Sequence, residues 1–187
     1  MTRNAATRSK KILVLTPQFP YPPHQGTTIR NFNLIVGLAQ ANEVHLLSFG
    51  NQAQIHDSPL HGLCRSVRIV QPPQRSMGQR VAGLFFSRLP DMAQRLPSPT
   101  YQAALDSTLK QEKPDVVEVE GIELAQYLFQ VAESRGRPGK PLLVFDDHNA
   151  EYVLQQRIFE TDIRRPLRWP GAIYSWIQWK KLERYEA

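Results

Sequence analysis

The stretch that most constrains the fold is residues 11–30. A continuous aliphatic run at 12–15 opens it, and such a run is typical of a strand covered on both faces. Four prolines between positions 17 and 23 then exclude a helix and regular strand pairing. Apolar residues at helical spacing begin just after Gly26. Because ligands of open α/β sheets bind beyond the carboxyl ends of strands, this order predicts a ligand site near Gly26.

The alternation of strand and helix patterns continues along the chain. Strands are predicted at 12–15, 44–48, 67–70, 114–121 and 141–149, and helices from 26 to near 42 and at 76–95, 98–112, 124–131, 149–160 and 171–186. In the first helix, Ile29, Phe32 and Ile35 share an apolar face, whereas Arg30 lies off it. Strands that alternate with helices predict a doubly wound, mainly parallel α/β sheet. Since no strand follows the last helix, we expect the domain to continue beyond these residues.

Composition narrows the class of protein. The chain has 187 residues, of which 41% are hydrophobic and 21% charged, so it is not composed like a disordered chain. Cys64 is the one cysteine, which excludes an internal disulfide, and we interpret it as a packing residue and not a nucleophile. The net charge of +6 is scattered, which argues against a nucleic-acid groove. No apolar segment resembles a signal peptide or a membrane span, so we expect a cytosolic or cytosol-facing protein.

Two segments combine basic and aromatic residues. They are residues 80–88, with Phe85 and Phe86, and residues 164–181, with three tryptophans. Such segments fit interfacial helices on an anionic membrane. Alternatively, the aromatic side chains pack on the sheet or on a missing domain.

Three polar clusters follow strands of the predicted sheet, at 17–27, 118–123 and 146–151. In a parallel sheet all three lie on one edge. The backbone N–H groups near Gly26 suit a phosphate or sugar hydroxyls, although a single glycine also fits an ordinary turn. His148, beside two aspartates, could act as a general acid–base or a hydrogen-bond donor. The alternative is that Asp147 or Asn149 caps the next helix and His148 fills a turn.

Other titratable residues are less informative. Glu118 and Glu120 point to the same face of their strand, which makes a paired-carboxylate hydrolase conceivable. We expect no metal site, because no shared ligand spacing links the histidines at 24, 45, 56 and 61.

Taken in order, four segments resemble family 4 glycosyltransferases. Residues 13–34 resemble the family's opening strand, loop and helix, residues 113–121 its fourth strand, residues 143–151 its strand ending in a histidine, and residues 180–186 a later helix. Residues 1–10 are polar and basic, which predicts a flexible tail. Over 11–187 the resemblance implies the Rossmann-like N-terminal domain of a GT-B enzyme that lacks its donor-binding domain. Such enzymes transfer a sugar from a nucleotide-sugar to a glycan or lipid-linked acceptor, with retention, in envelope or exopolysaccharide synthesis.

The resemblance also implies roles for particular residues. His148 would contact the transferred sugar as the catalytic residue, and substrate binding falls to Gly26, Thr27, Arg30, Glu120 and Asn149. No cofactor or metal is implied, because the nucleotide-sugar is a substrate. The chain departs from the family in having Gln25 where a second glycine is common, and the carboxylate pair of the second domain is absent. We therefore expect no turnover from residues 1–187 alone. The competing hypotheses are a non-catalytic binding or membrane-docking module and a flavodoxin-like nucleotide binder.

Overall fold

A computed structural model describes residues 9–133 and 140–186 of the chain. Most of the tail predicted at 1–10 therefore lies outside the described residues. Within the described part, five parallel strands form one sheet in the order β3-β2-β1-β4-β5. The strands are β1 (Lys11–Thr16), β2 (Glu43–Phe49), β3 (Ser66–Val70), β4 (Val116–Glu120) and β5 (Leu142–Asp146). This Rossmann-like arrangement confirms the predicted fold class.

The chain divides into two compact units. The first comprises residues 1–72 and 98–146 and contains the whole sheet, and the second comprises residues 73–97 and 147–187. Whether 11–187 acts as a single domain, as expected from the sequence, stays a prediction. Each unit is described by itself.

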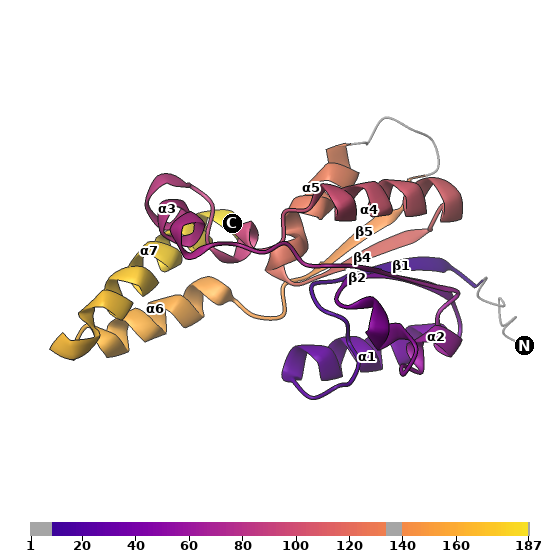
Figure 1. Cartoon of the computed structure of the whole chain (residues 1–187), viewed down its shortest axis with the longest axis horizontal. Helices are drawn as coiled ribbons and strands as arrows, with labels where there is room; N and C mark the ends of the chain where they lie inside the picture. Colours follow the sequence, from indigo (N-terminus) through magenta and orange to yellow (C-terminus); the bar gives the residue numbers. More distant parts are fainter. Residues whose placement is uncertain (1–8, 134–139, 187) are drawn as a thin grey trace, which may run out of the picture. The chain divides into compact units, whose positions relative to one another are not determined.

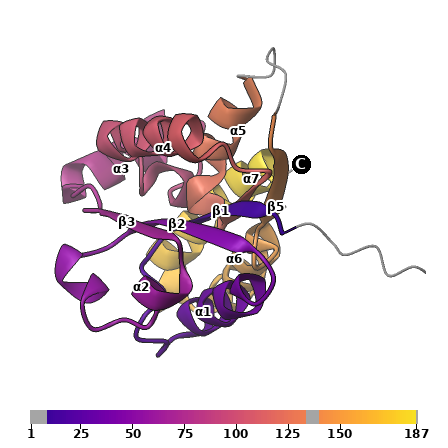
Figure 2. The same cartoon turned by 90° about the vertical axis from the view of Figure 1, so that its right-hand side faces the viewer.

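Helices cover both faces of the sheet in the first unit. On one face lie α1 (Gly26–Ala39) and the short α2 (Leu60–Leu63), and on the other lie α4 (Pro99–Glu112) and α5 (Ala125–Glu133), as both views show (Figures 1 and 2). The 3₁₀ turns η1 (Gln52–Ile55) and η3 (Ile122–Leu124) complete this unit. The crossover from one face to the other occurs between β3 and β4, so the strand order reverses between β1 and β4.

The face covered by α1 holds an aliphatic core. Buried members of this core include Val14 and Leu46 from the sheet and Ile35 from α1. The buried positions of α1 are Thr28, Asn31 and Ile35, while Ile29 is 45% exposed. The expectation that Ile29 faces the core was therefore wrong. Phe32 and Ile35 do pack in this core, and near the start of the helix the polar Thr28 and Asn31 are buried where Ile29 is not.

The opposite face is built around Tyr101. The Tyr101 ring is fully buried and stacks on Phe49, with 4.2 Å between the ring centroids. The Tyr101 hydroxyl donates a hydrogen bond to the Leu47 carbonyl at 3.0 Å. Ser98 caps α4 by accepting the Tyr101 N–H at 3.2 Å, and Pro99 occupies the first helical position. Both features confirm the predicted helix start.

The second unit is helical. It contains α3 (Met77–Phe86), η2 (Met92–Gln94), α6 (Glu151–Asp162), η4 (Pro166–Arg168) and α7 (Trp169–Tyr185). The single helix expected at 76–95 was wrong in its length, since α3 ends at Phe86 and a separate turn follows. Pro90 explains the break, because proline lacks the N–H that a continuing helix needs.

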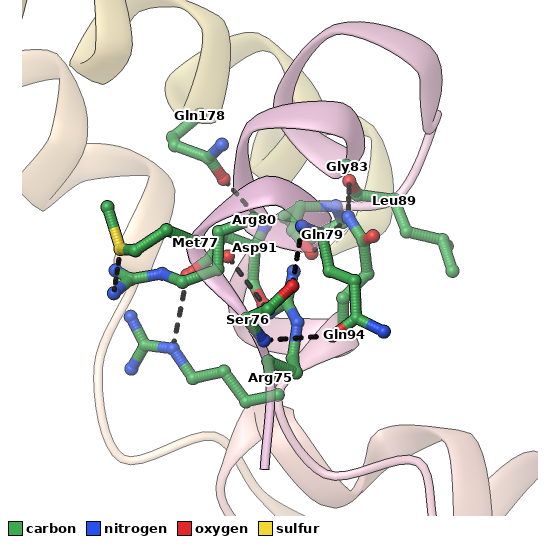
Figure 3. A network of polar contacts seen from close by, with 12 residues as sticks. Arg75, Ser76, Met77, Gln79, Arg80, Gly83, Leu89, Asp91, Gln94 and Gln178 are labelled. Carbon is green, nitrogen blue, oxygen red and sulfur yellow. Dashed lines mark hydrogen bonds and ion pairs between the residues drawn. The ribbon is translucent and has the colours of Figure 1, made fainter.

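A polar network around Asp91 joins the parts of the second unit (Figure 3). The Asp91 carboxylate contacts Arg75 at 3.0 Å and Arg95 at 3.3 Å, and its backbone N–H donates to the Gln178 side chain at 2.7 Å. Lys181 of α7 donates to the carbonyl of Leu84 at 2.6 Å. These contacts fix the segment between α3 and residue 97 against α7.

Candidate functional site

A pocket of about 300 Å³ lies at the carboxyl edge of the sheet in the first unit. Its walls come from the loop after β1, the start of α1, the end of β2 and η1. Apolar surface is supplied by Phe19, Tyr21 and Pro22, and hydrogen-bonding groups by Gln18, His24, Gln25, Thr28 and Gln54. A concave site with apolar walls and a few polar groups is typical of small-molecule binding.

The pocket wall near β2 depends on a glycine that sequence reasoning did not single out. A Cβ added at Gly50 would lie 2.8 Å from Gln54 Oε1 and 3.0 Å from Phe19 Cβ. A side chain at position 50 would force Gln54 to move and Phe19 to shift by a few tenths of an ångström. The tight contact keeps Phe19, which is 4% exposed, in its position as part of the pocket wall.

The start of α1 presents backbone N–H groups at the edge of this pocket. Thr28 Oγ1 accepts the Gln25 N–H at 3.0 Å and donates to the Gln25 carbonyl at 2.9 Å, so this side chain fixes the first turn. Gly26 is exposed, has open space around it, and Thr27 is half-buried. Because the first N–H groups of a helix have no intrahelical acceptor, this turn can donate to an anion or a hydroxyl.

A group of charged side chains lies at the carboxyl ends of β4 and β5. Arg30 of α1 forms an ion pair with Asp146, the last residue of β5. Glu120 ends β4, pairs in register with Asp146 and is fully buried. Burial, reinforced by the negative charge of Glu120, raises the pKa of Glu118, and Arg30 partly offsets this shift. The two glutamates thus share one face, as predicted, and Glu118 can hold a proton at a higher pH than an ordinary glutamate.

The glycine after β4 has a conformational role. Gly121 has a φ of 86°, which a side chain would strain, and its N–H donates to the Asp146 carbonyl at 2.8 Å. This turn directs the chain away from the sheet directly after Glu120. It keeps the ends of β4 and β5 at the same level.

Asn31 is a second residue that sequence reasoning missed. It is fully buried, and neither side-chain amide atom has a hydrogen-bond partner among residues 9–133 and 140–186. It lies one turn beyond Thr28 on the buried stripe of α1. A buried amide without partners costs about 1–3 kcal/mol, so its presence here is unusual for a purely structural residue. The signal in the sequence would have been a polar residue three positions after a helix-start threonine.

His148 and Asn149 belong to the second unit. His148 has a φ of 62°, in the left-handed region, and the Asn149 N–H donates across it to the Asp147 carbonyl at 2.6 Å. Ala150, not Asp147 or Asn149, occupies the N-cap of α6 and makes no side-chain cap. The capping alternative is therefore wrong, although His148 does lie in a turn. Non-glycine residues in this conformation are enriched at functional sites.

The structure brings some of the predicted site residues together. Within the first unit, Gly26 and Thr27 begin α1, and Arg30 reaches the end of β5 beside the carboxylates of β4. The pocket itself is lined by their neighbours Gln25 and Thr28 and not by the six predicted residues. Gly26, Arg30 and Glu120 thus lie at the expected edge of the sheet, and their role in binding a ligand stays a prediction. The pocket lies toward β2 and β3 and the charged group toward β4 and β5.

Comparisons with protein-family models, with curated proteins and with solved structures found no match for this chain. The fold and the sheet edge define the class by themselves: a Rossmann-like α/β protein with a pocket beyond the carboxyl ends of its parallel strands. Over the described residues, no helix combines the length and apolarity that crossing a membrane requires. Cys64 is buried in the core and burial raises its pKa to about 11, which agrees with a packing role.

Proposed function

We propose that this chain supplies the acceptor-side half of a retaining glycosyltransferase, with the pocket of the first unit as its sugar-binding site. The observation that carries the proposal is the composition of the pocket. Amide, hydroxyl and imidazole groups lie beside aromatic and proline surfaces, and the start of α1 adds backbone donors. Sugars present hydroxyl groups and apolar ring faces, so such a pocket matches them better than it matches a purely apolar ligand.

The charged group at the same edge of the sheet supports the same proposal. Glu118, with its raised pKa, and the Arg30–Asp146 pair provide proton-holding and hydrogen-bonding groups for a polyhydroxyl acceptor. His148 is proposed as the contact to the transferred sugar, with Asn149 beside it. In the family that the sequence resembles, a second α/β domain holds the nucleotide of the donor, so we propose that a nucleotide-sugar is the second substrate.

Saturation-transfer difference NMR tests the sugar site directly. A panel of monosaccharides, short glycans and nucleotide-sugars is added to the full chain, and we expect transfer to sugar protons. The variants Gln18→Leu and His24→Leu remove hydrogen-bonding groups of the pocket, and each is expected to weaken binding about tenfold, or ~1.4 kcal/mol. The matched control is His61→Leu, which changes an exposed histidine of α2 outside the pocket. The site would be refuted if no sugar receives saturation from the protein, or if all three variants bind sugar with equal affinity.

Turnover is a separate test. Incubation of residues 1–187 with nucleotide-sugars and acceptors is expected to give no transferred sugar. The proposed site binds the acceptor, and the carboxylate pair that holds the donor in the family belongs to the second domain. Sustained transfer by the purified chain would show that the acceptor-side assignment is wrong.

A second candidate function, membrane docking, rests on the surface of the second unit. In α3, Phe85 is 64% and Phe86 is 89% exposed next to Arg88. Leu167 is 98% exposed beside Arg168. Basic residues next to exposed apolar side chains fit an anionic lipid surface.

Vesicle flotation distinguishes docking on anionic lipid from nonspecific hydrophobic adsorption. Binding is expected to phosphatidylcholine vesicles that contain phosphatidylglycerol and not to pure phosphatidylcholine. The variant Phe86→Ser should reduce it, whereas Phe129→Ser, which alters an exposed phenylalanine of α5, should not. Binding that ignores lipid charge, or that both variants reduce equally, would count against docking through α3.

A further inference from the structure

A cluster of three possible metal ligands lies at the amino edge of the sheet, opposite the edge that carries the pocket. Glu43 and His45 come from β2 and Glu112 is the last residue of α4. One ligand atom from each residue lies within 4.8 Å of the others. His45 Nε2 is 3.1 Å from Glu43 Oε1 and 3.8 Å from Glu112 Oε2. In a tetrahedral zinc site the ligand atoms are about 3.3 Å apart, as bond lengths of about 2.0–2.1 Å require.

The histidine of this cluster is held in one orientation. Its side chain is 1% exposed, and its Nδ1 lies 2.7 Å from the hydroxyl oxygen of Ser66, its neighbour on β3. When Nδ1–H donates to Ser66, the lone pair of Nε2 faces the two carboxylates. In the other neutral tautomer Nε2–H donates to Glu43 and Nδ1 accepts from the Ser66 hydroxyl, so a metal ion at Nε2 would select the first tautomer. Metal-binding histidines commonly have their second nitrogen fixed by such an outer hydrogen bond.

The surroundings of the cluster favour a cation. The C-terminus of α4 carries the partial negative charge of the helix dipole. Lys11 already responds to this field, with its Nζ 3.5 Å from Glu43 Oε1 and 3.4 Å from the Glu112 carbonyl. Lys11 is 44% exposed on a flexible stem, so it can withdraw when another cation enters. The carboxylates are 37% and 28% exposed, which leaves the side-chain oxygens accessible to an ion from solvent.

We propose that Glu43, His45 and Glu112 bind a divalent transition-metal ion of the zinc type, with water completing its coordination. One imidazole and two carboxylates form a donor set that Zn²⁺ and Co²⁺ accept. The ion would join the start of β2 to the end of α4, so its effect is structural and separate from the pocket at the other edge. This proposal departs from the expectation of no metal site, which considered ligand spacing along the chain, because Glu112 is far from the other two ligands in sequence.

Titration of the tag-free full chain with ZnCl₂ by calorimetry tests the proposal, and Co²⁺ gives an independent optical readout. We expect one ion per chain, visible d–d absorption with Co²⁺ and a higher melting temperature. Glu43→Gln and Glu112→Gln remove ligands that are partly exposed, so both variants should fold, and each should weaken binding at least tenfold. Ser66→Ala removes the hydrogen bond that orients the His45 ring and should weaken metal binding by about 10- to 100-fold.

Two further variants separate a metal site from a plain ion-pair cluster. Lys11→Met removes the competing cation and should tighten Zn²⁺ binding. If the cluster is only a structural ion-pair group, the variant should lose the Lys11–Glu43 pair without any gain in Zn²⁺ affinity. His61→Ala, which alters an exposed histidine outside the cluster, should leave binding unchanged. No binding of either ion at millimolar concentration would overturn the proposal. So would binding that Glu43→Gln and Glu112→Gln leave intact, which would place the ion elsewhere.

Discussion

The network around Asp91 allows a quantitative prediction for the second unit. The Asp91 side chain is 10% exposed and Arg75 is 16% exposed, so this pair is largely removed from water. Arg95 is 47% exposed and its contact with the same carboxylate is longer. Asp91→Asn keeps the size of the side chain and the backbone bond to Gln178, but it removes the negative charge that Arg75 requires.

The expected cost follows from burial. Removing one partner of a buried ion pair costs about 3–5 kcal/mol, because the other charge is left without compensation. Arg75 retains some solvent and can still donate to the asparagine oxygen, which lowers the expected loss to about 2–4 kcal/mol. Arg95→Gln is the control, since exposed pairs contribute about 0–1 kcal/mol.

Tryptophan fluorescence during urea unfolding measures this change selectively. The protein has three tryptophans, at 169, 176 and 179, and all belong to α7 of the second unit. With an m-value of about 2 kcal/mol per molar urea, the midpoint should fall by about 1–2 M in Asp91→Asn. A double-mutant cycle with Arg75→Gln should give a coupling above ~1 kcal/mol. Equal, small shifts in Asp91→Asn and Arg95→Gln would show that the buried pair does not stabilise this unit.

Three further predictions concern the first unit. Asn31→Leu keeps the number and branching of side-chain atoms and removes a buried amide without partners, so it should raise stability by about 1–3 kcal/mol in calorimetric melting; destabilisation would show that the amide is satisfied. The pKa of Glu118 is raised in the folded state, so the folded protein keeps this proton up to a higher pH than the unfolded chain does. The free energy of unfolding should therefore fall as the pH rises from the ordinary pKa of glutamate through the raised pKa. Glu118→Gln should remove that fall and stabilise the protein at neutral pH, as urea unfolding across this range would measure; an unchanged pH profile would contradict the shift. Cys64, with a pKa of about 11, should react with iodoacetamide at neutral pH only after unfolding, and rapid labelling of the native chain would disprove its burial.

Local sequence signals predicted most of the fold. Each predicted strand segment overlaps one of the five strands, and β1 is buried and aliphatic from Ile12 to Leu15 because a central parallel strand is covered on both faces. The helix expected at 98–112 corresponds to α4, which Ser98 caps at its start, and capping depends on residues only a few positions apart. These features depend on residues close together in the sequence, so the sequence alone predicts them.

Errors arose where packing overrode the local pattern. Ile29 shares an apolar face of α1 with Phe32 and Ile35 but is exposed, and the polar Thr28 and Asn31 are buried near the start of the helix instead. The helix expected at 76–95 ends at Phe86, and the segment after it is held by Asp91 and its arginines. Neither outcome follows from periodicity, which gives the apolar face of a helix but not the surface that the helix contacts.

The sequence by itself determined that this chain is a parallel α/β protein with polar groups at the carboxyl edge of its sheet. That much follows from alternating apolar runs and from residues that follow each strand. Only the tertiary structure decided which of those groups meet. Arg30 pairs with Asp146 across 116 positions, and Glu43 and His45 meet Glu112 at the opposite edge. Such contacts depend on strand order and register, and these are set by the packing of distant segments that no local pattern encodes.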